Sequence, residues 1–195
     1  MEIKDMTPDV RRLYDMKSVI FDIKWLMTAP NLELYYMYRD VKAQTEQGIR
    51  YDITVVPPLM LGTEFVKTKG HKHVKNQAEI YTVLEGKAIY LVQKQTGNEI
   101  QDVFATETNP GEFFIVPEGY GHITINPTKE KLVMANWIDY ECENEYMLYE
   151  KLRGACYYYT KDGWIKNSNY VKVPKLRFEK PQKQLPTSLG FLRNP

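Results

Sequence analysis

Short runs of strand-forming residues, each closed by turn-forming residues, dominate the middle of this 195-residue chain. Residues 79–84 end at Glu85-Gly86, and residues 88–93 are soon followed by Thr96-Gly97-Asn98, a hairpin-type turn. Strands that recur about every eight to twelve residues are typical of a β-sandwich or a barrel. The pattern therefore predicts an all-β fold, with further strands at 32–38, 51–56, 65–68, 102–105, 113–116, 122–125 and 132–138.

The composition agrees with this fold class and excludes several others. Aromatic residues make up 13% of the chain and favour the half-buried faces of sheets. The 26 Lys and Arg residues nearly balance the 25 Asp and Glu residues, so the net charge of +1 gives no case for nucleic acid or a membrane surface as a partner. Two cysteines are too few for a disulfide framework. No transmembrane helix or signal peptide is evident, so we expect a soluble, cytoplasmic protein.

The chain is predicted to form a single domain (1–195) whose strands build a barrel core at 31–140. An irregular N-terminal segment (1–30) precedes the core. Short helices are expected within it at 10–16 and 21–27. The globular composition and the chain length are sufficient for one buried core without disulfide or metal staples.

A C-terminal extension (141–195) follows the predicted barrel. We expect a loop and a short helix within 140–153, a hairpin over 155–165, and an extended tail from Pro174 onward. Aromatic-rich edge strands and an extended tail favour a homodimer, because a second copy would cover sheet edges that are otherwise open.

The chain has three histidines, His71, His73 and His122, of which His122 opens a predicted strand. His71 and His73 are two residues apart, so on a strand their imidazoles point to the same side. Glu79 opens the next strand and can return its carboxylate to that side, and Tyr81 shares the face of Glu79. His122 comes from a later strand. Together these side chains predict a metal site assembled from neighbouring strands of a barrel.

The donor set indicates a transition metal without selecting one. Imidazoles and one carboxylate suit Fe, Mn, Ni, Zn or Co, and the general order of affinities does not decide among them. Four protein ligands in an octahedral site would leave two positions for substrate or water, whereas a closed structural zinc site leaves none. An H-x-H pair also occurs by chance, and histidines are often surface or core residues without a metal. The residues alone leave both interpretations open.

Two segments resemble the signature motifs of the cupin superfamily. Residues 71–86 have the form H-x-H-x5-E-x6-G, and residues 111–126 have the form G-x5-P-x-G-x2-H-x3-N. The second motif matches at every defined position. The first has five residues between His73 and Glu79, where cupins usually have three or four. The resemblance implies the cupin double-stranded β-helix, a jelly-roll barrel, with His71, His73, Glu79 and His122 as metal ligands.

A longer stretch resembles one family of cupins. Residues 68–73, T-K-G-H-K-H, with Glu79 and Tyr81 are similar to the T-K-G-H-x-H…E-x-Y segment of the cupin-type glucose-6-phosphate isomerases, best known from archaea. Residues 10–16 are similar to the V-R-R-L-x-D-M segment of that family. Pro30 and the two tyrosines of 35–38 fit its first strand, and the resemblance covers roughly residues 10–150.

This resemblance implies an enzyme that interconverts glucose 6-phosphate and fructose 6-phosphate, in glycolysis and gluconeogenesis. It implies one divalent metal, with Fe as the first choice and Ni, Zn, Mn or Co as alternatives. Glu79 and Tyr81 become the candidate catalytic residues. The candidate residues for binding the sugar phosphate are Tyr35, Thr54, Thr68, Lys69 and Gly70. From the residues alone, Thr54 and Thr68 equally fit ordinary strand propensity, and Tyr35 equally fits a core or dimer contact.

The chain departs from the family at two positions of this predicted site. The family has a G-H-D-Y segment after the last barrel strand, where residues 143–146 read E-N-E-Y, so Asn144 stands in place of its His. An aromatic phosphate contact just before it is Ile138 here, although Tyr140 is close in sequence. Alternatives are therefore another metal-binding cupin, either a non-haem iron dioxygenase or a non-catalytic sugar-binding protein.

Overall fold

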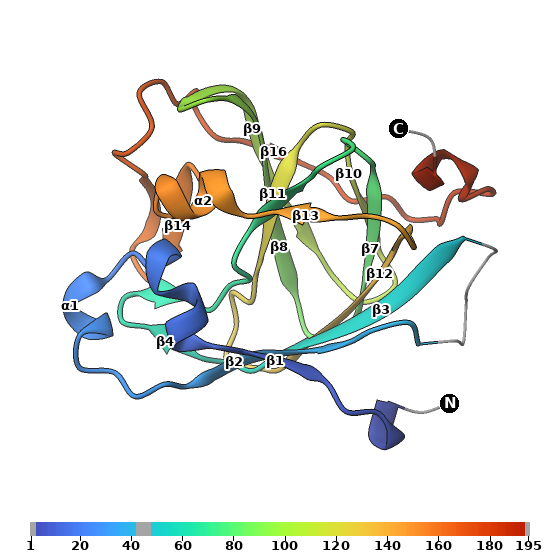
Figure 1. The fold of residues 1–195 in the computed structure, drawn as a ribbon, viewed down its shortest axis with the longest axis horizontal. Helices are drawn as coiled ribbons and strands as arrows, with labels where there is room; N and C mark the ends of the chain where they lie inside the picture. Colours follow the sequence, from blue (N-terminus) through green and yellow to red (C-terminus); the bar gives the residue numbers. More distant parts are fainter. Residues whose placement is uncertain (1–2, 42–47, 194–195) are drawn as a thin grey trace.

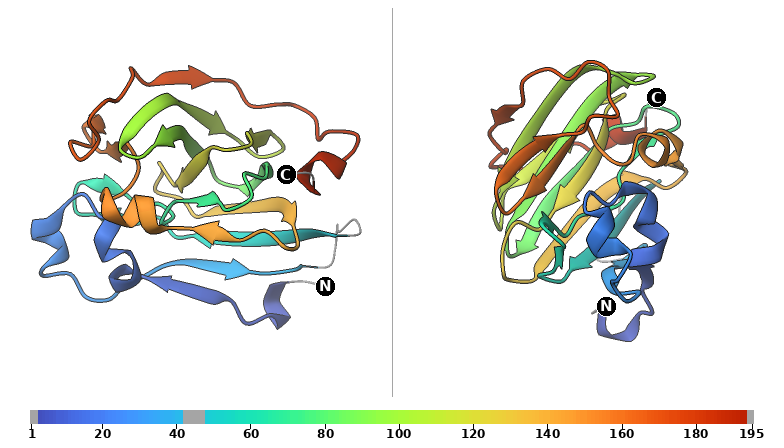
Figure 2. Two further views of the ribbon diagram at one scale, coloured as in Figure 1. Left: turned by 45° about the horizontal axis from the view of Figure 1, so that its top comes forward. Right: turned by 90° about the vertical axis from the view of Figure 1, so that its left-hand side faces the viewer.

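The computed structural model describes residues 3–41 and 48–193, which are built around two six-stranded sheets (Figure 1). The sheets lie one over the other as layers, with the N-terminal strands in one layer and β8 and β9 in the other (Figure 2). The predicted all-β fold, a jelly-roll barrel, is confirmed in this architecture. The two ends of the predicted single domain and residues 42–47 of its barrel core lie outside the described residues.

The first sheet joins strands that are far apart in sequence. Its order is β1 (Asp9–Arg12), β2 (Glu33–Tyr38), β3 (Ile49–Val56), β12 (Leu132–Asp139), β7 (Glu79–Glu85) and β10 (Phe113–Val116). All of these neighbours pair antiparallel. β12, the last strand of the barrel, lies between β3 and β7 and so joins the N-terminal strands to the rest of the sheet.

The second sheet carries two of the histidine-bearing strands. Its order is β13 (Asn144–Glu145), β6 (His71–His73), β11 (Gly121–Ile125), β8 (Ala88–Thr96), β9 (Glu99–Thr108) and β16 (Arg177–Glu179). The outermost pair, β16 with β9, is parallel, and the other pairs are antiparallel. The C-terminal tail thus supplies an edge strand to the barrel.

A small third sheet and five short helices complete the described chain. The sheet has the order β15 (Gly163–Lys166), β14 (Tyr157–Thr160), β5 (Glu64–Phe65) and β4 (Met60–Leu61). The helices are η1 (Ile3–Asp5), η2 (Leu13–Val19), α1 (Ile23–Leu26), α2 (Met147–Lys151) and η4 (Gly190–Arg193). None of the helices in the described part of the chain could reach from one side of a bilayer to the other.

The alternation of side chains along β3 creates two apolar layers. Val56 belongs to the interior cluster, together with Tyr90 and Ile123 of the opposite sheet. Tyr51 belongs to a second cluster on the outer face of the first sheet, which includes Leu192 of η4. The C-terminal end therefore covers the outer face of the sheet, and the other side of β3 is left to line the interior.

The structure corrects the prediction for the N-terminal segment. Residues 10–16 were expected to be helical, but Val10 to Arg12 belong to strand β1, and the 3-10 helix η2 begins only at Leu13. Strand β1 pairs with β2, so that Arg11 lies opposite Tyr35. A tertiary partner has overridden the local pattern here. The second expected helix, at 21–27, is present but shorter: it is α1, which spans Ile23–Leu26.

The predicted strands are otherwise found, with changed lengths. The strand expected at 65–68 is wrong beyond Phe65, because Lys67 forms only an isolated bridge with Ile125. Strands β8 and β9 extend further than predicted, up to the turn at Gly97, whose φ of 58° suits glycine. The predicted hairpin over 155–165 is confirmed as β14 and β15. Strand β13 was not predicted, although the short helix after it was.

Candidate metal centre and substrate cavity

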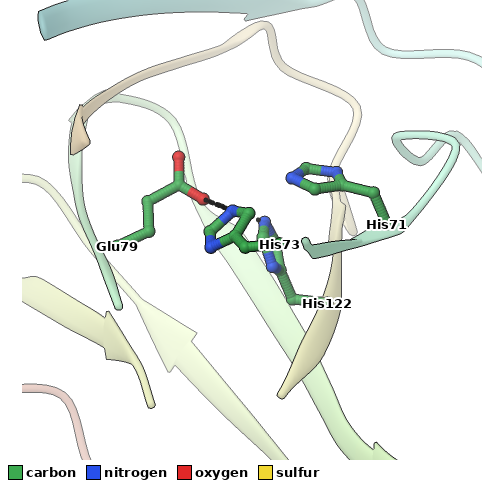
Figure 3. A group of neighbouring side chains, drawn as sticks. All are labelled: His71, His73, Glu79 and His122. Carbon is green, nitrogen blue, oxygen red and sulfur yellow. Dashed lines mark ion pairs between the residues drawn. The ribbon is translucent and has the colours of Figure 1, made fainter. Parts of the chain in front are cut away.

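The three histidines and Glu79 converge from both sheets (Figure 3). His71 and His73 come from β6, and His122 lies opposite His71 on the neighbouring strand β11. Glu79 is the first residue of β7 in the other sheet. One donor atom of each side chain lies within 4.8 Å of the others. The convergence predicted from the sequence is therefore present.

The backbone around β6 requires glycine next to the histidines. Gly70 has a φ of +86°, and a Cβ atom there would lie 2.5 Å from the ring of Tyr149. With glycine at position 70 the chain can pass close to Tyr149 as it enters β6. His71 then lies beside His122, and the centroids of the two rings are 4.4 Å apart.

Glu79 and His73 each use one polar side-chain atom in a hydrogen bond, and each has a second atom that could bind a metal. Asn136 Nδ2 donates a hydrogen bond of 2.7 Å to Glu79 Oε1. His73 Nδ1 lies 2.7 Å from the carbonyl oxygen of Gln77, which fixes the other nitrogen, Nε2, toward the cluster. His73 Nε2 and Glu79 Oε2 are buried without a hydrogen-bond partner and lie 3.3 Å apart. Buried polar atoms are normally satisfied, so these two atoms fit a cation that both could bind.

His122 is held differently. Its Nε2 lies 3.3 Å from Glu79 Oε2 and 3.0 Å from the hydroxyl of Tyr81, while its Nδ1 is buried without a partner. His71 is half-buried and lines the neighbouring cavity. The cluster thus has three buried members and one half-buried member.

Burial and mutual charge set the protonation of the cluster. Burial and the neighbouring His122 hold the pKa of His71 well below its usual value. Burial also lowers the pKa of His122. Burial alone would raise the pKa of Glu79, but the imidazoles of His122 and His73, each 3.3 Å from its Oε2, outweigh burial and hold that pKa well below the usual value. Glu79 is therefore a carboxylate, and His71 and His122 are neutral imidazoles. Burial lowers the pKa of His73, but Cys142 and Glu79 outweigh burial and raise it to about 10, so a cation bound there would displace the proton of His73.

These residues fit a divalent transition metal. The donor set consists of imidazole nitrogens and one carboxylate, which suits Fe, Mn, Ni, Zn and Co. Gln77 and Asn136 bind the outer atoms of two ligands, the arrangement that orients ligands in metal sites. His71, His73, Glu79 and His122 can therefore hold one cation.

A cavity opens beside the cluster. His71 and Glu79 line it, whereas His73 and His122 are not among its lining residues. All of the other predicted site residues also line it: Tyr35, Thr54, Thr68, Lys69, Gly70 and Tyr81. The structure therefore brings the predicted catalytic and substrate-binding residues to one cavity that includes two of the candidate ligands.

Contacts within the protein already hold part of this lining. The hydroxyl of Tyr35 accepts a hydrogen bond of 3.2 Å from the backbone N–H of Lys69. Thr68 Oγ1 accepts one of 2.9 Å from the backbone N–H of Thr124. Lys69 Nζ pairs with Glu150 at 2.5 Å. The segment from Thr68 to Gly70 is thus fixed at the wall of the cavity.

The positions where the sequence departs from the family also belong to this cavity. Asn144 and Ile138 both line it. Tyr140 does not: it is 59% exposed, so it cannot replace the aromatic residue for which Ile138 stands.

Sequence reasoning missed several lining residues. Arg11, Arg39, Arg50, Asn136 and Tyr146 face the cavity but were not predicted as site residues. Strand alternation starting from Thr54 would have placed Arg50 on the same face of β3. No comparable signal was available for Arg11, since it fell in a predicted helix.

Comparison with known proteins identifies the family. The sequence pattern of the family described as "Glucose-6-phosphate isomerase (GPI)" matches residues 10–175. The chain belongs to the glucose-6-phosphate isomerase family. The sequence resemblance over roughly 10–150 is therefore confirmed, and the match extends beyond it.

Named relatives of this glucose-6-phosphate isomerase family member come from archaea of two genera. Glucose-6-phosphate isomerase of Thermococcus litoralis is 34% identical over 128 residues, which cover 64% of this chain and 65% of that protein. The protein of the same name from Pyrococcus furiosus is 32% identical over 135 residues, or 67% of this chain and 69% of that protein. The matched region thus spans just under two thirds of the Thermococcus litoralis protein.

Solved structures with a similar chain path are more distant. Oxalate oxidase in complex with glycolate is 20% identical, with a TM-score of 0.42 over 56% of this chain and 52% of that one. A mutant of Bacillus subtilis oxalate decarboxylase is 21% identical, with a TM-score of 0.43 over 62% of this chain and 31% of that one.

Proposed function

We propose that this protein is a metal-dependent aldose–ketose isomerase that interconverts glucose 6-phosphate and fructose 6-phosphate, as in glycolysis and gluconeogenesis. The observation that carries the proposal is the shared cavity, in which Glu79 and His71 of the metal-binding cluster face Tyr35, Thr68 and the chain at Gly70. Membership of the glucose-6-phosphate isomerase family supports it.

The isomerisation moves a hydrogen between C1 and C2 of the sugar and changes which oxygen is the carbonyl. A divalent cation held by His71, His73, Glu79 and His122 would polarise the carbonyl and stabilise the charge that develops on its oxygen. We propose Fe as this cation, with Ni, Zn, Mn or Co as alternatives that the same donors accept.

Glu79 is the proposed proton carrier. It is ionised, and it is the carboxylate of the cluster that lines the cavity. A general base must lie within hydrogen-bond reach of the proton that it takes, directly or through one water. Because Asn136 holds Oε1, Oε2 is the atom of Glu79 left for this exchange, and it would have to leave or share its bond to the cation. A hydride shift between C1 and C2 is the competing route, which would leave Glu79 as a ligand alone.

Tyr81 is the proposed hydrogen-bond donor to the sugar. Burial, followed by the charge of Glu79, raises the pKa of Tyr81 well above its usual value, so its hydroxyl keeps its proton. In the structure this hydroxyl lies 3.0 Å from His122 Nε2. When His122 turns that nitrogen to a cation, the hydroxyl of Tyr81 becomes available to orient an oxygen of the sugar.

The phosphate of the sugar is proposed to lie at the opposite wall. The hydroxyls of Thr54, Thr68 and Tyr35 and the backbone N–H of Gly70 can bind its oxygens, with Lys69 beside them on the same wall. Such contacts bind the part of the substrate that does not react, and so position its other end at Glu79.

We further propose that the chain acts as a single cupin domain, as a homodimer, and in the cytoplasm. The continuous interior cluster, which draws residues from both sheets and from η2, supports the single domain. The open edge of the small sheet at β15 and the exposed Phe178 on edge strand β16 are places where a second copy could bind.

A coupled assay for the conversion of fructose 6-phosphate, run with an oxygen electrode, tests the proposed activity. The protein with metal added should form glucose 6-phosphate without oxygen uptake. Oxygen consumption would instead indicate a non-haem iron dioxygenase. Saturable binding of the sugar phosphate without turnover would indicate a non-catalytic sugar-binding protein, the alternative for which Asn144 in the cavity gives reason.

A further inference from the structure

We propose that Arg11 binds the phosphate group of the substrate. This inference rests on the proposed function, because it assigns a residue to the phosphate end of the proposed substrate. It begins from the four cationic side chains that line the cavity: Arg11, Arg39, Arg50 and Lys69.

Three of these four cations already have a carboxylate partner. Arg39 Nη1 lies 2.7 Å from Asp52 Oδ2, and Arg50 Nε lies 3.0 Å from the same oxygen. Lys69 Nζ lies 2.5 Å from Glu150 Oε1. Lys69 thus has a carboxylate of its own, whereas Arg39 and Arg50 share the single negative charge of Asp52.

Arg11 lacks such compensation. Among the described residues, no carboxylate lies within ion-pair distance of it, and its Nε is buried without a hydrogen-bond partner. An uncompensated guanidinium beside a cavity attracts an anion and repels a metal cation.

The strand register explains why Arg11 and not its neighbour faces the cavity. Arg11 lies opposite Tyr35 across the β1–β2 pair, and a register shift separates Arg11 from Arg12. Arg12 does not line the cavity, and its Nη2 pairs instead with Glu33 Oε1 at 2.6 Å on the exposed side. Two adjacent arginines thus have different surroundings, which provides a matched control.

The position of Arg11 fits a phosphate rather than a smaller anion. Its charge acts on the hydroxyl of Tyr35, whose pKa burial raises and Arg11 lowers. That hydroxyl is hydrogen-bonded to the backbone N–H of Lys69, next to Gly70. The guanidinium, the hydroxyl and the chain at Gly70 therefore line one end of the cavity. Several donors around one point, with a fork-shaped cation among them, match the several acceptor oxygens of a phosphate.

The test compares Arg11→Ala, Arg11→Lys and Arg11→Gln with Arg12→Ala in the metal-loaded protein. Isothermal titration with inorganic phosphate gives its Kd, and the coupled assay gives KM and kcat for fructose 6-phosphate. We expect Arg11→Ala to raise both KM and the phosphate Kd by about ten- to hundredfold, the worth of hydrogen bonds to a charged group, with kcat and bound metal nearly unchanged. Arg11→Lys should recover part of the affinity, and Arg12→Ala should stay within about twofold of the wild type.

An unchanged phosphate Kd in folded Arg11→Ala, or an equal loss in Arg12→Ala, would overturn the inference, as would a wild type that binds no inorganic phosphate at millimolar concentration. If Arg11→Ala does not fold, Arg11→Gln keeps the side-chain length and decides the question in the same titration. If the wild type binds phosphate but does not convert fructose 6-phosphate, the proposed activity fails, while the phosphate titration still tests Arg11.

Discussion

Asn136 donates a hydrogen bond of 2.7 Å to Oε1 of Glu79, across the pairing of β12 and β7. The other oxygen of Glu79 lies 3.3 Å from both His73 Nε2 and His122 Nε2. Asn136 therefore fixes the rotation of the carboxylate so that one oxygen faces the cluster. It is a positioning residue for the metal site.

Replacing Asn136 by Ala should weaken metal binding. Without the amide, the carboxylate of Glu79 is free to rotate, and loss of such an outer partner typically costs about 10- to 100-fold in metal affinity. Competition with a fluorescent chelator measures this affinity directly. Asn136→Asp should be worse than Asn136→Ala, because a second carboxylate beside Glu79 opposes its ionisation. Equal metal affinity in the wild type and both variants would contradict this role.

The metal cluster could be predicted from the sequence because most of its residues lie close together along the chain. His71, His73 and Glu79 lie close together in sequence, within residues 71–79, and the position of His122 follows from a motif with glycine and proline at fixed places. The same segment predicted Thr68, Lys69 and Gly70 at the cavity wall.

The sequence could not predict the parts of the site that depend on strand pairing. Asn136 becomes a partner of Glu79 only because β12 lies beside β7, and Arg11 reaches the cavity only because β1 pairs with β2. Residues 10–16 have no regular period strong enough to exclude a helix, so tertiary contacts decided the outcome there. The two-residue strand β13 similarly exists through its pairing with β6.

Thr68 should contribute to both stability and substrate affinity. Its Oγ1 accepts a hydrogen bond of 2.9 Å from the backbone N–H of Thr124, and it lines the cavity. Thr68→Ala should therefore lower the free energy of unfolding by about 1–3 kcal/mol and raise KM for fructose 6-phosphate roughly tenfold. Thr68→Ser retains the hydroxyl and should resemble the wild type in both denaturant melts and kinetics. An unchanged KM in Thr68→Ala would remove Thr68 from the phosphate site.

A buried ion pair between Lys67 and Glu64 joins the N-terminal segment to the barrel. Both side chains are almost completely buried, and Glu64 Oε2 also accepts a hydrogen bond of 3.1 Å from the backbone N–H of Phe21. Burial lowers the pKa of Lys67 and raises that of Glu64, while each partner opposes the shift of the other. Removing either partner should destabilise the fold, because the other charge would then be buried without a partner.

Lys67→Met should destabilise the fold by about 3–5 kcal/mol, because it leaves Glu64 buried without its partner. Adding Glu64→Gln to this variant should recover part of the loss. Urea unfolding of the wild type, both single variants and the double variant measures the coupling as a double-mutant cycle. If the two single losses add without coupling, the pair does not act as a unit.

The C-terminal tail should detach in acid. The Lys183 hydrogen bond, followed by the backbone N–H of Asn109, lowers the pKa of Glu112 from 4.5 to about 2, and Arg177 lowers that of Asp102. A carboxyl group whose folded pKa is lowered stabilises the structure above its unfolded pKa, and this stabilisation is lost as the pH falls through the folded value. The tail contact between Phe113 and Gln182 should therefore weaken between about pH 4.5 and 2.

The amide signals of Phe113 and Gln182 in NMR spectra report this release. In Lys183→Gln the transition should move upward, toward the ordinary pKa of Glu112, because the lysine no longer favours the carboxylate. A tail that stays attached at pH 2, or a midpoint that does not move in Lys183→Gln, would show that other contacts hold it.

The most direct test of the account is a titration of the metal-stripped protein with Fe²⁺ in which bound metal and the rate of fructose 6-phosphate isomerisation are followed together. We predict that the rate rises in proportion to bound metal and reaches its plateau at one ion per chain, and that His71→Ala neither binds the ion tightly nor gains activity. Full isomerase activity in the stripped protein, or in His71→Ala without bound metal, would contradict the central claim that these three histidines and Glu79 hold the catalytic ion.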